Sequence, residues 1–258
     1  MKGKLIEKFT GEVRSLLEGN SRAVEIFERI MSDEELLSLI DHANTVAILR
    51  WGYNDHGVVH ALITTRNAVK MAKILHDRGM KLNCESEIEA SFDDGLAAIV
   101  MSAMMHDVGN MVTRTDHEML SAITVRDRVE KILRDMKMDI RLMSYVLEGI
   151  VCHMGRLKAT SLEAKLISIA DGLDMEEGRA RIPYKLSGPD IHKFSALAIK
   201  RVEISHGAKK PIKITVEMSE SAGTFQVEEV LMKKFRAAEF GKMAELYAKV
   251  NGEVIRYS

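Results

Sequence analysis

Apolar residues recur every three or four positions along most of the chain, which is the spacing of amphipathic helices. Near the start, Leu5, Phe9 and Val13 form one such stripe, and Asp33 precedes another as a typical helix cap. Residues 1–50 are therefore expected to form N-terminal helices that pack on a larger core.

The middle of the chain predicts a longer series of helices. Thr160 and Glu163 have the spacing of a capping box, which predicts the start of the last of them. The loop GRARIPYKLSGPD then holds two of the three prolines, and a domain boundary is expected near Gly188-Pro189. The helices expected over residues 51–188 are His56–Asp77, one from Asp93-Asp94 to Met105, His117–Met136, Asp139–Val151 and one that ends near Asp171.

The pattern changes over residues 189–258, where apolar and polar residues begin to alternate as they do in strands. This part predicts a small α+β appendage, a β-hairpin plus a helix, on a mostly α protein. The expected elements are hairpin strands at Ile199–Ser205 and Ile212–Met218, an amphipathic helix at Val227–Val250 and a short strand at Val254–Tyr257.

Composition narrows the class of protein. A chain of 258 residues, of which 46% are hydrophobic and 29% charged, can bury a sizeable core without disulfides. The 37 Lys and Arg balance 38 Asp and Glu, so we expect neither a general nucleic-acid binder nor a binder of anionic membranes. No apolar run has the length of a membrane span, and Cys84 and Cys152 lack a CxxC spacing. The expected location is the reducing cytoplasm.

The candidate chemistry lies in histidines and aspartates at the ends of predicted helices. His106 and Asp107 follow a nearly uncharged helix, where an unpaired ionisable pair would be costly. Imidazole and carboxylate groups together suit a divalent metal ion. Adjacent side chains diverge on a helix, so both reach one metal only where the helix ends, and Gly109 permits such an end. The ordinary interpretation, a surface or satisfied core histidine, is kept for His42, His76, His192 and His206.

The order His60, His106-Asp107, Asp171 resembles that of the HD-domain superfamily of metal-dependent phosphohydrolases, over about residues 50–185. The resemblance implies an HD-domain helical bundle in which these four residues bind one metal ion. The segments NDHGVVH and ADGLDMEEGRARIPY are most similar to those of uncharacterised prokaryotic, notably archaeal, HD proteins. The stretches that carry the resemblance are NDHGVVHALITTRNAVKMAKIL, IVMSAMMHDVGN, TDHEMLSAI, GIVCHMGRL and SIADGLDMEEGRARIPY.

Two further histidines, His117 and His153, match the dinuclear branches of this superfamily. The resemblance therefore implies two divalent metal ions, of Mn, Fe, Ni, Mg or Zn, with Asp107 as the bridging ligand. One of those branches, the cyclic-di-nucleotide phosphodiesterases, continues the doublet as HDxGK. Here Asn110 replaces that lysine and no GYP triplet follows, so the chain departs from that branch.

His56 lies four positions before His60, and this spacing resembles the start of the cyclic-nucleotide phosphodiesterases, in which the earlier histidine protonates the leaving oxygen. If both residues are helical, they lie one turn apart on the same face. His56 is therefore a candidate general acid. The competing interpretation is that Asp55-His56-Gly57 only caps the helix.

Three charged residues follow the last expected metal ligand. Asp174, Arg179 and Arg181 are candidates for substrate binding, because the planar guanidinium of arginine matches the oxygens of a phosphate. The alternative for these arginines is a set of surface ion pairs.

These observations predict a metal-dependent phosphohydrolase, with Asp107 and His56 as catalytic residues. It would cleave a phosphomonoester or phosphodiester, of a nucleotide or another phosphorylated small molecule, with metal-activated water. A homo-oligomer is compatible with the sequence. Two alternatives stay open, an HD-type di-iron oxygenase with the same ligands, and a regulatory module that binds metal or nucleotide without turnover.

Overall fold

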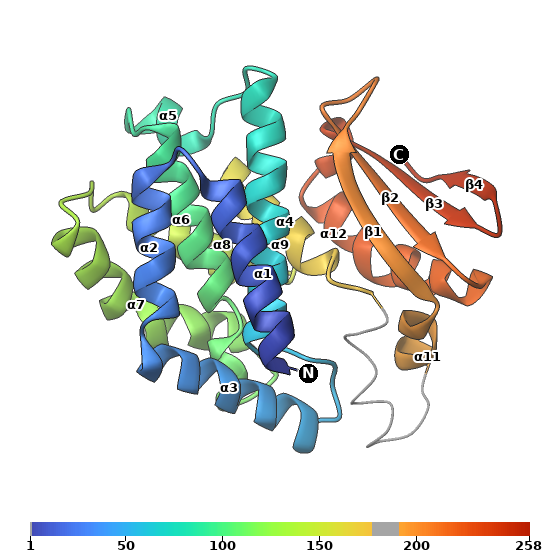
Figure 1. Ribbon diagram of the computed structural model, residues 1–258, viewed down its shortest axis with the longest axis horizontal. Helices are drawn as coiled ribbons and strands as arrows, with labels where there is room; N and C mark the ends of the chain where they lie inside the picture. Colours follow the sequence, from blue (N-terminus) through green and yellow to red (C-terminus); the bar gives the residue numbers. More distant parts are fainter. Residues whose placement is uncertain (1, 177–190) are drawn as a thin grey trace.

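The computed structural model describes residues 2–176 and 191–258 of the chain. A bundle of helices is followed by a small sheet, as predicted (Figure 1). No helix in these two ranges is both long enough and apolar enough to cross a membrane. The helices before the gap are α1 (Lys2–Leu17), α2 (Ser21–Met31), α3 (Glu34–Leu49), α4 (Val58–Asp77), α5 (Asn83–Glu87), α6 (Phe92–Met105), α7 (His117–Asp135), α8 (Leu142–Cys152) and α9 (Leu162–Gly172), with a 3-10 turn η1 (Val108–Met111).

The bundle is built around α6, which is apolar on all sides and buried from Asp94 to Met105. A helix without a polar face is stable only inside a core. It contacts α2, α4, α8 and α9, and α1 packs on the outer side of α4. Because α6 is enclosed in this way, the residues at its C-terminal end are held firmly inside the protein.

Local hydrogen bonds explain where several helices begin. The Asp33 carboxylate accepts a hydrogen bond from the amide of Leu36 at the start of α3. The capping box expected from Thr160 and Glu163 is wrong. Ser161 caps α9 instead, and the Glu163 carboxylate accepts from two amides at the start of α5. Glu163 therefore joins two helices that are distant in sequence.

The second part of the protein is a four-stranded sheet in the order β1-β2-β3-β4. The outer pairs are antiparallel and β2 runs parallel to β3, so the chain must cross over between these two strands. The elements are α11 (Ile191–Leu197), β1 (Ile199–His206), β2 (Ile212–Met218), η3 (Ser221–Gly223), the π-helical η4 (Gln226–Leu231), α12 (Met232–Ala237), η5 (Phe240–Lys242), β3 (Ala244–Val250) and β4 (Glu253–Arg256).

The hairpin and the last strand were predicted at these positions, but the helix expected over Val227–Val250 is wrong in its second half. The helical part ends at Ala237, and residues 244–250 form β3. Ala244, Leu246 and Ala248 are buried on one face of this strand. Their period of two is a strand pattern, which the helical spacing just before it had obscured.

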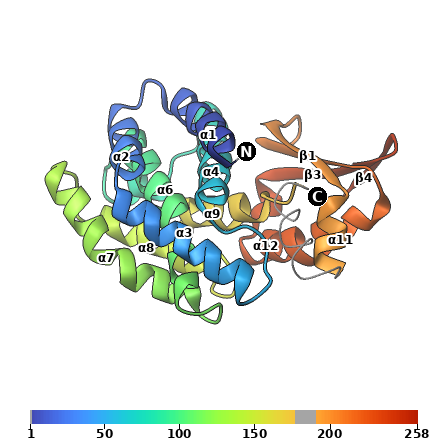
Figure 2. The same ribbon diagram turned by 60° about the horizontal axis from the view of Figure 1, so that its bottom comes forward.

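The sheet packs against the helical bundle through one continuous apolar core. Both views place α4 and α9 on the side of the bundle that faces the sheet and α12 (Figures 1 and 2). At the end of α4, Arg78 donates a hydrogen bond to the carbonyl of Gly207 in the β1–β2 turn. The junction expected at Gly188-Pro189 lies outside the described residues.

Glu245 of β3 holds the β1–β2 turn against the sheet. Its Oε1 accepts hydrogen bonds from the amides of Lys209 and Lys210, at 2.6 and 3.0 Å, and the Tyr247 hydroxyl donates to Oε2. These hydrogen bonds to the charged form lower the pKa of Glu245 from 4.5 to about 2.

We expect Glu245→Gln to lower the melting temperature at neutral pH. Because the pKa of Glu245 is lower in the folded chain, its stabilisation is present above pH 4.5 and is lost as the pH falls through 2. The difference in melting temperature between wild type and variant should therefore shrink from pH 6 to pH 3, as followed by circular dichroism. Glu253→Gln, on the exposed strand β4, is the control. A difference that does not change with pH would contradict this role.

Candidate metal centre

The His106-Asp107 doublet lies where α6 ends. His106 is the C-cap residue of α6, and Asp107 is the residue before η1. Because the helix ends here, the two adjacent side chains reach the same histidine and aspartate cluster. The helix ends at the doublet, as expected there, and Gly109 has a further role. A Cβ on Gly109 would overlap the His117 carbonyl and the Ser121 amide, so the glycine lets the start of α7 pack against the doublet.

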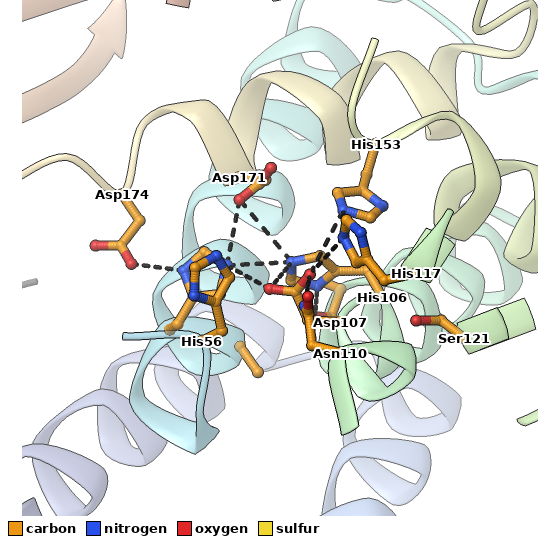
Figure 3. A network of polar contacts seen from close by, with 12 residues as sticks. His56, His106, Asp107, Asn110, His117, Ser121, His153, Asp171 and Asp174 are labelled. Atoms are coloured by element: carbon orange, nitrogen blue, oxygen red, sulfur yellow. Dashed lines mark hydrogen bonds and ion pairs between the residues drawn. The ribbon is translucent and has the colours of Figure 1, made fainter. Parts of the chain in front are cut away.

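Two pairs of histidines face each other through their Nε2 atoms. These atoms lie 3.1 Å apart between His60 and His106, and 3.2 Å apart between His117 and His153. In Figure 3, Asp107 lies near the middle of the cluster, with His117 and His153 together on one side. All five side chains are buried.

Asp107 contacts each pair with a different oxygen. Its Oδ2 lies 3.4 Å from Nε2 of both His60 and His106, whereas its Oδ1 lies 3.1 Å from Nε2 of His117 and 3.6 Å from that of His153. Asp171, at the end of α9, places Oδ1 3.2 Å from Nε2 of His60. The structure thus brings together all six residues that were expected to bind metal.

The other ring nitrogens fix the tautomers of these histidines. Nδ1 of His106, His117 and His153 lies 2.6–3.0 Å from the backbone carbonyl three residues earlier in each case. A carbonyl only accepts hydrogen bonds, so Nδ1 carries the proton and Nε2 presents a lone pair to the cluster. Nδ1 of His60 lies 2.6 Å from Oδ2 of Asp174, with the same consequence.

This arrangement fits a bound cation. Two facing lone pairs cannot form a hydrogen bond with each other, and Oδ2 of Asp107 is buried without a hydrogen-bond partner in the described chain. Two groups of donor atoms are close enough to hold a metal ion, His60 with His106 and Asp171, and His106 with Asp107 and His153. Imidazole nitrogens and carboxylate oxygens are the donors that divalent transition metals prefer.

The charges have the signs that metal binding needs. Burial raises the pKa of Asp107, but interactions with His106 and His56 outweigh it and hold that pKa well below its usual range. Burial also raises the pKa of Asp171. The charge of Lys234, together with the contacts of His60 and His106, outweighs burial and holds this pKa well below its usual range. Burial lowers the pKa of His153 to about 4. At neutral pH both carboxylates are charged and His153 is neutral, as metal ligands must be.

His56 lies beside this cluster, although not on the first turn of α4 as expected, because that helix begins at Val58. The rings of His56 and His60 are still only 5.6 Å apart, and His56 lines the cavity next to the doublet. Asp55 accepts a hydrogen bond from the Gly57 amide. Gly57 is the N-cap residue of α4, but no side chain among the described residues caps this helix, so the capping interpretation of Asp55-His56-Gly57 does not account for the place of His56 beside the cluster.

Asp174 lies elsewhere than its expected role in substrate binding requires. It is buried behind His60, in contact with Nδ1, and does not line the cavity. A carboxylate in this place orients the histidine. Arg179 and Arg181, the other two expected substrate-binding residues, lie outside the described residues.

Two cations that had not been expected line the cavity, Arg114 and Lys234. Arg114 comes from the loop before α7. Its sequence position between the doublet and His117 could have predicted that it lies near the cluster. Lys234 comes from α12 in the C-terminal part, and no sequence spacing links it to the motif. The cavity, of about 110 Å³, is large enough for several water molecules. The described residues that line it are His56, Asp107, Arg114, His153, Met154, Asp171, Gly172, Val230 and Lys234.

A helical bundle with a buried cluster of histidines and aspartates defines a metal-binding protein of the HD class. Residues 57–176 match the family model described as HD domain. An uncharacterized protein of Methanocaldococcus jannaschii is 37% identical over 231 residues, which cover 88% of this chain and 89% of the relative. No solved structure matches significantly. The chain belongs to the HD domain family, and with it to a superfamily of metal-dependent hydrolases.

We expect Asp107→Asn to lower the affinity for divalent metal by at least about 10-fold, because the amide removes the negative charge between the two histidine pairs. Helical content should be nearly unchanged, since the two side chains have the same shape. Elemental analysis after incubation with Mn²⁺ and desalting measures the metal. Asp127→Asn, on the exposed face of α7, is the control. Equal metal content in all three proteins would show that the doublet does not hold the ion.

Proposed function

We propose that this protein is a phosphohydrolase that cleaves a phosphomonoester or phosphodiester, with a nucleotide as its substrate and two divalent metal ions as cofactors. The observation that carries the proposal is the position of Asp107, which presents one oxygen to each pair of histidines. A single ion would need only one of these pairs, so the arrangement supports two ions with Asp107 as the bridge.

The residues divide between the two ions as follows. His60, His106 and Asp171 would hold the first ion together with Asp107, and His117 and His153 would hold the second, also with Asp107. Four imidazoles favour Mn, Fe, Ni or Zn over Mg, which prefers oxygen ligands. When bound, such ions lower the pKa of water and neutralise charge that develops on the phosphate.

The remaining roles fall to side chains around the cavity. Nδ1 of His56 lies 2.5 Å from the Asn54 carbonyl and keeps its proton there, so Nε2 is the atom that delivers a proton to the leaving oxygen. Asp174 keeps the ring of His60 in place through Nδ1. Arg114 lines the cavity with its guanidinium stacked over Tyr53, where it can attract an anionic substrate.

The test is a panel of nucleotides and phosphodiesters, assayed for release of phosphate or alcohol with Mn²⁺, Fe²⁺, Ni²⁺, Zn²⁺ and Mg²⁺ in turn. Oxygen uptake with iron is measured in parallel. We expect hydrolysis and no substrate-dependent oxygen uptake. Oxygen uptake without hydrolysis would identify a di-iron oxygenase, and metal binding with neither reaction would identify a regulatory module.

We further expect His117→Ala/His153→Ala to keep one of two metal ions and to lose activity by about 100-fold or more, since stabilisation of charge would no longer be divided between two ions. Metal stoichiometry and turnover are measured on the same sample. The control is His42→Ala/His206→Ala, which removes two exposed histidines. One ion per wild-type chain together with full activity of the first variant would refute the two-metal site.

A further inference from the structure

We propose that the C-terminal unit, residues 191–258, completes the catalytic cavity, and that Lys234 binds a phosphate oxygen of the substrate there. This inference rests on the proposed function. Lys234 lies on α12, in the crossover between two strands of the sheet, and therefore outside the matched HD domain. It reaches the site because α12 and η4 pack against α9, while the strands β1 and β2 contact α4.

The ammonium group of Lys234 is fixed by two partners in the helical bundle. Nζ lies 2.5 Å from Oδ2 of Asp171 and 2.7 Å from the carbonyl oxygen of His153. Its side chain is only 8% exposed, so the group is largely removed from water. Asp171 is thereby held by one oxygen while the other faces His60.

The space for this lysine is built into α9. A Cβ on Gly172 would come within 2.9 Å of Cδ of Lys234, so the glycine that follows Asp171 makes room for the lysine stem. Val230, one helical turn before Lys234, also lines the cavity. The C-terminal unit thus contributes one wall of the cavity and one charge.

This charge has a donor to spare. A lysine ammonium has three N–H groups, and Asp171 and His153 account for two of them in the described chain. Arg114, the other cation among the described residues that line the cavity, already contacts Asn110 and His117. A phosphate group that enters the cavity would meet the third N–H of Lys234, whose side chain is largely buried.

The experiment titrates inorganic phosphate into the metal-loaded full-length protein by calorimetry, so that it needs no turnover. Lys234→Gln should weaken phosphate binding by at least about 10-fold when both proteins are loaded to the same metal content. It should raise KM more than it lowers kcat, and Lys234→Arg should recover part of the affinity. Lys233→Gln is the matched control, because Lys233 is exposed on the same helix and pairs with Glu229.

A second pair of variants leaves Lys234 and its contacts intact. Val230→Asp places a negative charge on the same wall and should also weaken phosphate binding, whereas Val230→Asn should not. If Lys234→Gln does not fold, this pair still tests whether the C-terminal unit forms a wall of the phosphate site, and equal phosphate binding by Val230→Asp and wild type would overturn that part of the inference. Wild-type protein that does not bind phosphate, or folded and metal-loaded Lys234→Gln that binds it as wild type does, would overturn the inference. If wild-type protein binds phosphate but hydrolyses no substrate of the panel, only the proposed function is refuted.

Discussion

The constraint on which this structure depends is that four imidazole lone pairs and two carboxylates are buried at one point. Groups of this kind repel one another when no cation lies between them, and burial strengthens the repulsion. The fold keeps them together by fixing the opposite side of each group. Three histidines are held by carbonyls three residues earlier, His60 is held by Asp174, and Asp171 is held by Lys234. The polar cluster is therefore formed in advance for a cation, as a metal site with an ordered outer shell must be.

This preformed site depends on apolar packing farther away. Because α6 is buried on all sides, the doublet at its end has little freedom to move. Two glycines then allow backbone and side chains to approach closely. At Gly109 the missing side chain lets the start of α7, with His117, pack closely. At Gly172 it leaves room for the aliphatic part of the Lys234 side chain. Either position with a larger side chain would push a ligand or its partner out of place.

Much of this could be predicted from the sequence, and the exceptions have a common cause. Long helices have strong periodicity, and the HD ligand order is a specific motif, so both were found. The strand β3 was missed because a short alternating segment directly followed a helical one. Lys234 and the contact of Asp174 with His60 were missed because a sequence gives proximity along the chain, not the direction in which a side chain points. Lys234 contacts Asp171 because α12, which lies between strands β2 and β3 in the chain, packs against α9.

The family match therefore covers the metal centre better than it covers the cavity. It begins at residue 57, directly after His56, and ends at residue 176, well before Val230 and Lys234. The HD domain contains all six candidate metal ligands, whereas the groups that could give up a proton or bind the phosphate come partly from either side of it. A shared metal centre fixes the class of chemistry, and the substrate is chosen by what surrounds it. In this protein His56 and the C-terminal unit are the described parts of that surrounding that lie outside the matched residues, so differences in substrate between such chains should follow differences in these two parts.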